Sequence, residues 1–179
     1  KTNIHVKIKI IFTMLFWLLA ISINAQQPLY RGITSGMTKN EFTKYVNSQT
    51  DLKWTDNKEF IEVTIKDRLY LFSPDYNEKG KVKMLLFFSM DSYEWYDYDK
   101  VEKNAVELFR LLSVSYGDPT YDNWPAWTEI IDEEPTITCV FLKESVGASI
   151  VVSKRSDLFY VSLIVMDTDF VDKEPQSSE

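Results

Sequence analysis

The residues best suited to chemistry gather between Asp91 and Asp99, where nine residues hold four aromatic and four carboxylate side chains. Three functions would use such a set. Aromatic rings stack on sugars while carboxylates accept hydrogen bonds from hydroxyl groups, clustered carboxylates bind calcium, and Tyr and Trp form the centres of protein contacts. The EF-hand spacing and its glycine are absent, which disfavours calcium. The structural alternative is a strand-to-helix connection whose aspartates cap the helix and whose aromatic rings cover the core edge.

A second aromatic segment, Tyr121–Trp127, follows the same type of pattern. We assign Trp127 to the core and place Trp124 over the end of a sheet. If the chain contains two similar halves, Trp54 and Trp124 take equivalent positions and line one surface. The candidate residues for binding a ligand or partner are Trp54, Tyr93, Trp95, Tyr96, Tyr98 and Trp124.

Enzymatic chemistry has little support in the residue types. His5 is the only histidine and Cys139 the only cysteine, so Ser-His-Asp catalysis and a zinc site built from these residues are not expected. Two carboxylates suffice for glycoside hydrolysis, but with 27 acidic residues such pairs are inevitable. No glycine-rich phosphate loop is present. We therefore expect no catalytic residues, metal or cofactor, and a buried, inert Cys139.

The first 25 residues have the pattern of a secretory signal peptide: three lysines, an apolar run at 10–23, and a small residue at Ala25. An uncleaved anchor is the alternative. No cysteine lies near the cleavage position, so no lipid anchor is expected. The segment holds three of the 20 basic and none of the 27 acidic residues, which leaves a charge of −10 on the rest. This charge disfavours binding to nucleic acid or anionic membranes. We expect a periplasmic or secreted protein without a membrane span after signal removal.

Two helices are predicted by their start and stop signals. Thr38 and Glu41 have the spacing of a capping box, which indicates a helix over 38–48. Apolar residues three and four apart predict a second helix over 98–116, capped by Asp97 or Asp99 and ended by Gly117. An irregular segment over 26–35 precedes the first helix, and a polar, disordered tail over 168–179 ends the chain.

Seven strands are predicted by alternation and short turns. Pro74 should end the second of them, and Ile137, Cys139 and Phe141 should share one face of the fifth. The predicted ranges are 59–66, 68–73, 81–90, 126–131, 136–143, 147–154 and 157–166. Strands that follow each helix in a run indicate an α+β fold. We expect one antiparallel sheet with two helices packed on one face. Residues 26–167 then form a single domain of two related helix–meander halves, at about 36–90 and 97–167.

The stretch Arg31–Phe42 resembles the opening of the SmpA/OmlA family of small outer-membrane assembly lipoproteins, which share its Gly-Met-Thr and acidic residue before a helix. The doubled helix-plus-meander order is similar to that of domains of the β-lactamase-inhibitory-protein type. The lipobox cysteine of the first group and the cysteine pairs of the second are absent. The resemblance implies a binding module in an exported compartment. We expect a non-enzymatic domain that contacts another envelope or secreted protein, with a carbohydrate-binding accessory protein, and hence a glycan partner, as the alternative.

Overall fold

The computed structural model describes residues 27–171. The predicted signal peptide lies outside this range, as do residues 172–179 of the predicted tail. The first four residues of that tail form a short helix, α4 (Thr168–Val171). Among residues 27–171, no helix is both long and apolar enough to cross a membrane.

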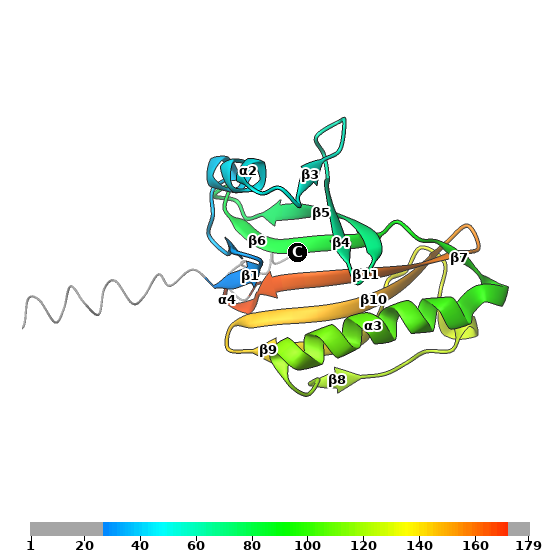
Figure 1. The fold of residues 1–179 in the computed structure, drawn as a ribbon. Helices are drawn as coiled ribbons and strands as arrows, with labels where there is room; N and C mark the ends of the chain where they lie inside the picture. Colours follow the sequence, from blue (N-terminus) through cyan, green and yellow to red (C-terminus); the bar gives the residue numbers. More distant parts are fainter. Residues whose placement is uncertain (1–26, 172–179) are drawn as a thin grey trace, which may run out of the picture.

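Two main helices and an antiparallel sheet make up the fold, which belongs to the α+β class as expected (Figure 1). The helices are α2 (Lys39–Ser48) and α3 (Tyr98–Tyr116). The strands are β1 (Pro28–Tyr30), β2 (Ile33–Thr34), β3 (Lys53–Trp54), β4 (Ile61–Ile65), β5 (Arg68–Tyr76), β6 (Val82–Ser89), β7 (Tyr93–Glu94), β8 (Tyr121–Asp122), β9 (Thr136–Lys143), β10 (Val146–Arg155) and β11 (Leu158–Asp167). Two 3-10 turns, η1 (Trp95–Asp97) and η2 (Trp127–Glu129), complete the order.

The strand order of the large sheet is β3-β4-β5-β6-β11-β10-β9-β8, and β7 pairs with β11 beside this path. Strands β6 and β11 meet at the centre, where Leu86 lies opposite Ile164. Each main helix is followed by four strands that run from one edge of this order to the centre. The strand predicted at 81–90 is β6, one of this central pair. A separate two-stranded sheet, β1-β2, replaces the irregular segment expected at 26–35.

Both helices begin and end where their signals placed them. The Thr38 hydroxyl accepts from the Glu41 amide, and the Glu41 carboxylate accepts from the Thr38 amide, so the capping box is formed. Gly117 ends α3 with φ +89°, a conformation that glycine adopts without strain. Asp97 takes the predicted N-cap position of α3 but makes no capping hydrogen bond with its side chain, and Asp99 lies within the first turn. The backbone of Asp97 belongs to η1, and its carboxylate pairs with Lys100 at 2.8 Å instead of capping the helix.

The core lies against the inner face of the sheet. Phe72 and Phe87 stack there with ring centroids 4.9 Å apart. Val101 and Leu108 of α3 belong to the same hydrophobic cluster, as does Phe42 of α2. Helix α3 lies along β9, β10 and β11. Alternate residues of β11 are buried in this core, as the alternating pattern predicted, whereas β10 is buried at every position over 146–152.

Three details of the strands differ from the sequence predictions. Pro74 continues β5 opposite Leu85. The pairing of β5 with β4 extends only as far as Phe72, so Pro74 lies where β5 is an edge, and proline is tolerated there. No strand forms at 126–131, where η2 replaces it. A bulge at Thr138 leaves Cys139 opposite Ile150 and Ile137 opposite Val151. The extra residue moves Ile137 to the other face of the sheet from Cys139. As a result, Ile137 is 47% exposed instead of sharing the buried face of Cys139.

Candidate functional site

The aromatic residues at 91–99 divide into an inward pair and an outward pair. Tyr93 is buried, and its hydroxyl accepts a hydrogen bond from Arg68 Nη1 at 2.9 Å. Tyr98 is also buried, with its ring against Phe159 and its hydroxyl donating to the Pro125 carbonyl at 3.1 Å. These two tyrosines are parts of the core edge, as the structural alternative proposed. They offer little surface to a ligand.

The outward pair, Trp95 and Tyr96, meets Trp127 to form an aromatic cluster. Their exposed fractions are 56%, 60% and 45%. The ring centroid of Trp95 lies 5.6 Å from that of Tyr96 and 5.8 Å from that of Trp127. The turns η1 and η2, which are distant in the sequence, thus bring three large rings together on the surface. The assignment of Trp127 to the core is wrong because η2 turns its side chain outward.

Acidic side chains surround the aromatic cluster. A hydrogen bond with Glu94, then burial and the charges of Glu94 and Asp97, raise the pKa of Tyr96. Burial, followed by the charges of Glu102 and Glu129, raises the pKa of the neighbouring Tyr98 to about 12. Such effects require carboxylates close to these hydroxyl groups. Lys100 also lies in this region, where it pairs with Asp97 at 2.8 Å.

Trp54 and Trp124 lie apart from one another. Trp54 is in β3, where its ring lies near Phe42 and its Nε1 donates to Asn47 Oδ1 at 2.9 Å. Trp124 follows β8 and packs against Phe109. Strands β3 and β8 are the two ends of the strand order, so the structure does not join these tryptophans in one surface.

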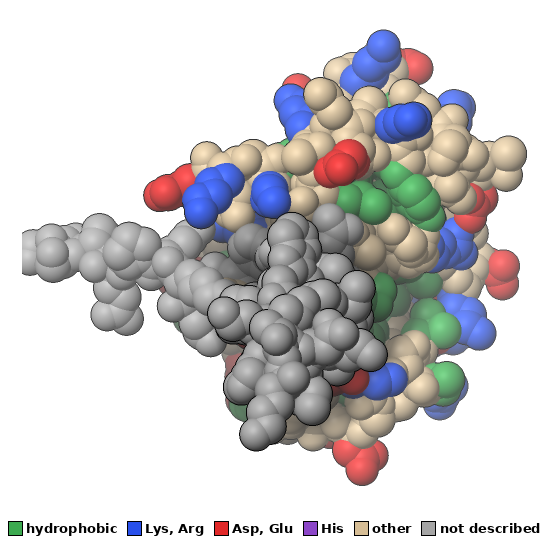
Figure 2. Space-filling model, turned by 90° about the vertical axis from the view of Figure 1, so that its left-hand side faces the viewer, with side chains coloured by type: hydrophobic (Ala, Val, Ile, Leu, Met, Phe, Trp, Pro, Cys, Tyr) green, Lys and Arg blue, Asp and Glu red, His purple; other side chains and the backbone are tan. Residues whose placement is uncertain are grey.

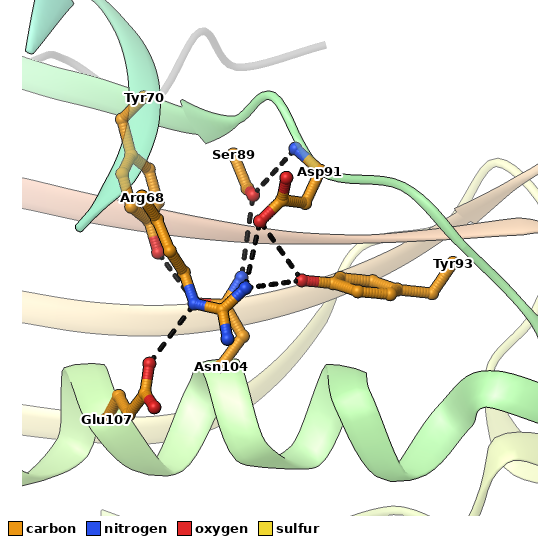
Figure 3. A network of polar contacts seen from close by, with 7 residues as sticks. All are labelled: Arg68, Tyr70, Ser89, Asp91, Tyr93, Asn104 and Glu107. Atoms are coloured by element: carbon orange, nitrogen blue, oxygen red, sulfur yellow. Dashed lines mark hydrogen bonds and ion pairs between the residues drawn. The ribbon is translucent and has the colours of Figure 1, made fainter. Parts of the chain in front are cut away.

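A polar network that includes Tyr93 links β5 to α3 (Figure 3). Arg68 donates from Nη1 to Asp91 at 2.9 Å and from Nε to Glu107 at 3.1 Å. Tyr70 donates to Asn104 Oδ1 at 2.8 Å, and the Asn104 amide donates to Ser89 at 3.4 Å.

Each of these side chains is satisfied by another member of the network, and Asn104 is fully buried. Such a satisfied polar network holds a helix in a fixed position on a sheet. It was not identified from the sequence, because its members come from β5, the end of β6, the following loop and α3.

The outer face of the sheet is the second broad surface. Opposed residues of an antiparallel pair point to the same side. Leu71 therefore shares a face with Phe88, which is 41% exposed and lies opposite Ser162. On β10 and β9, Val151 lies opposite the exposed Ile137. Phe88 and Ile137 are thus apolar side chains that this face exposes to solvent.

The remaining candidate for chemistry is Cys139, which is fully buried. Burial, followed by the nearby Asp122, raises the pKa of its thiol to about 12. The sulfur is therefore protonated near neutral pH and a poor nucleophile, in agreement with the expected inert residue.

No group of three His, Cys, Asp or Glu side chains in the described part of the chain is arranged to hold a metal ion. Comparison with known proteins adds no identity: no family model, curated protein or solved structure matches this chain.

Proposed function

We propose that this protein is an exported, non-enzymatic binding domain that contacts another protein of the bacterial cell envelope. The aromatic cluster of Trp95, Tyr96 and Trp127 is the centre of that contact. The observation that carries the proposal is that three exposed aromatic rings, brought together from η1 and η2, lie within contact distance of one another. Rings of this kind form the hot spots of protein interfaces because they bury much area at little entropic cost.

The partner in this proposal presents Lys or Arg side chains. Glu94 and Asp97 lie beside Tyr96, with Lys100 paired to Asp97, and a guanidinium over the face of a Trp gains a cation–π interaction. The charge of −7 on the whole chain steers the same partner.

The architecture supports a rigid contact surface. We infer that both helices cover the same face of the sheet, because Phe42, Leu108 and Phe87 share one hydrophobic cluster. We also infer that the chain consists of two related halves, since each main helix is followed by four strands that end at the centre of the sheet. The outer sheet face around Phe88 extends the contact surface for the same partner.

The test is an affinity series on the partner captured by the full chain. Trp95→Ala should weaken binding roughly 30-fold, the effect of losing about 2 kcal/mol at a hot spot. Tyr121→Ala is the matched control, because Tyr121 is also exposed but lies on β8. Binding should also weaken as salt is added.

The proposal fails if Trp95→Ala and Tyr121→Ala bind the partner equally well. A glycan array separates the alternative. Saturable glycan binding that Trp95→Ala abolishes, with no protein captured, would replace the protein partner with a carbohydrate.

A further inference from the structure

We propose that a cavity beside α3 binds an amphiphile with one apolar chain and a carboxylate head group. The cavity has a volume of about 780 Å³ and is bounded by α3, β1 and the β4–β5 and β9–β10 turns. Pockets that enclose small organic ligands have volumes of about 300–1,000 Å³. The site is therefore large enough for a medium or long alkyl chain. It is separate from the aromatic cluster and goes beyond the proposed function.

The part of the cavity between α3 and β11 is apolar. Leu108 and Leu112 line it from α3, and Leu163 and Val165 line it from β11. These four side chains are buried in the hydrophobic core. A nucleotide or sugar would leave its polar groups unpaired against such walls. An alkyl chain loses no hydrogen bonds there and gains about 25 cal/mol for each Å² removed from water.

The rim of the cavity is basic in a chain that is acidic overall. Arg31, Lys66 and Lys143 line it, with Glu144 as the one acidic residue of the lining. Lys143 Nζ is held at the rim by the Ser115 carbonyl at 2.8 Å, while Arg31 also pairs with Asp51. With Arg31 neutralised by Asp51, the lining still has two lysines against one glutamate, and this small positive excess complements an anionic head group.

Figure 2 views the end of the molecule that carries β1 and the β9–β10 turn, where hydrophobic side chains are visible among basic and acidic ones. An apolar interior with a cationic mouth fits a molecule whose tail enters first and whose carboxylate stays at the surface. Neither the walls nor the rim alone selects this class of ligand.

The experiment uses the full chain and cis-parinaric acid, a fluorescent long-chain carboxylate. We expect a saturable increase in fluorescence, displaced by hexadecanoate. Methyl hexadecanoate, which keeps the chain but loses the charge, should compete roughly tenfold less well, and butyrate should not compete. Absence of saturable binding overturns the proposal. Equal competition by the acid and its ester refutes the carboxylate.

Two pairs of variants locate the site. Ser115→Trp places a large ring at the mouth of the cavity. Val114→Trp is the control, because Val114 is the preceding residue of α3, is highly exposed and does not line the cavity. Affinity should fall at least tenfold for Ser115→Trp and stay unchanged for Val114→Trp. Equal affinities would place the ligand elsewhere and refute the assignment.

The second pair reverses charge without touching the core. Lys66→Glu should weaken parinarate binding roughly fivefold, the effect of reversing one exposed charge near the ligand. Lys58 is the control, because it is also exposed and also has a positive φ, but lies outside the cavity lining. This pair decides the outcome if circular dichroism shows that Ser115→Trp does not fold. Equal loss in Lys66→Glu and Lys58→Glu refutes the basic rim. Trp95→Ala should leave parinarate binding unchanged, which separates this site from the proposed partner surface.

Discussion

Replacing Asn104 by Ala should destabilise the domain by about 3 kcal/mol. Asn104 is fully buried and accepts the hydrogen bond of the Tyr70 hydroxyl at 2.8 Å. Its removal leaves that hydroxyl without this partner in the core, a loss of about 1–3 kcal/mol. The truncated side chain also leaves a small cavity beneath α3, which adds to the loss.

A double-mutant cycle isolates the hydrogen bond from the cavity. Tyr70→Phe removes the donor and should cost about 1–2 kcal/mol by itself. Because each single variant already abolishes the same contact, the double variant should be more stable than the summed effects predict, by about 1 kcal/mol. The assay is urea unfolding followed by fluorescence and circular dichroism. Ser115→Ala, at an exposed position of the same helix, should change the free energy of unfolding by less than about 0.5 kcal/mol.

Additivity of the two single variants within about 0.3 kcal/mol would refute the coupling. A loss near zero for Asn104→Ala would show that the network does not hold α3 on the sheet. Either result would remove the support that the network gives to the first residues of α3, which follow the aromatic cluster directly.

Three further predictions concern the N-cap of α2, the buried Tyr98 and the thiol of Cys139. Thr38→Ala removes the hydroxyl that caps α2 and should lower the free energy of unfolding in urea by about 1 kcal/mol; an unchanged midpoint contradicts the capping role. Burial raises the pKa of Tyr98 from 10.0 to about 12, so its contribution to stability is complete below pH 10 and is lost as the pH rises towards 12. The melting temperature of Tyr98→Phe should therefore fall less steeply over this range than that of the exposed-site control Tyr121→Phe, and parallel curves would oppose this. Finally, the buried thiol of Cys139 should react with a thiol reagent at pH 8 only in urea; rapid reaction of the native protein would disprove its burial.

The helices were predictable because their signals are local. Apolar residues at spacings of three and four define α3, and Gly117 ends it. The long strand β11 followed from alternation over ten residues, and β10 followed from the shorter alternation of Ala148, Ile150 and Val152. The two-residue strands β3 and β8 have no such pattern, because two residues cannot show a period. Their pairing depends on the neighbouring strand.

Part of the candidate site could be predicted from the sequence, and part depends on neighbouring elements. Composition singled out Trp95 and Tyr96, but the faces of Tyr93 and Tyr98 depend on where η1 starts and α3 begins. Trp127 joins the cluster because a helical turn replaces the expected strand. The sequence signals for that turn were Pro125 and a glutamate three residues after Ala126, and in the structure the Ala126 amide donates to Glu129 at 2.8 Å. The bulge at Thr138 has no signal in one sequence, since it is a property of the register with β10.

The central claim is that the aromatic cluster contacts a protein partner. Its most direct test places a photo-crosslinking phenylalanine analogue at Tyr96 in one sample and at Tyr121 in another, in the native envelope, followed by mass spectrometry. We predict one dominant protein adduct from position 96, attached at a segment rich in Lys and Arg, and none from position 121. Adducts of equal yield at the two positions, or no adduct at position 96, would contradict the account.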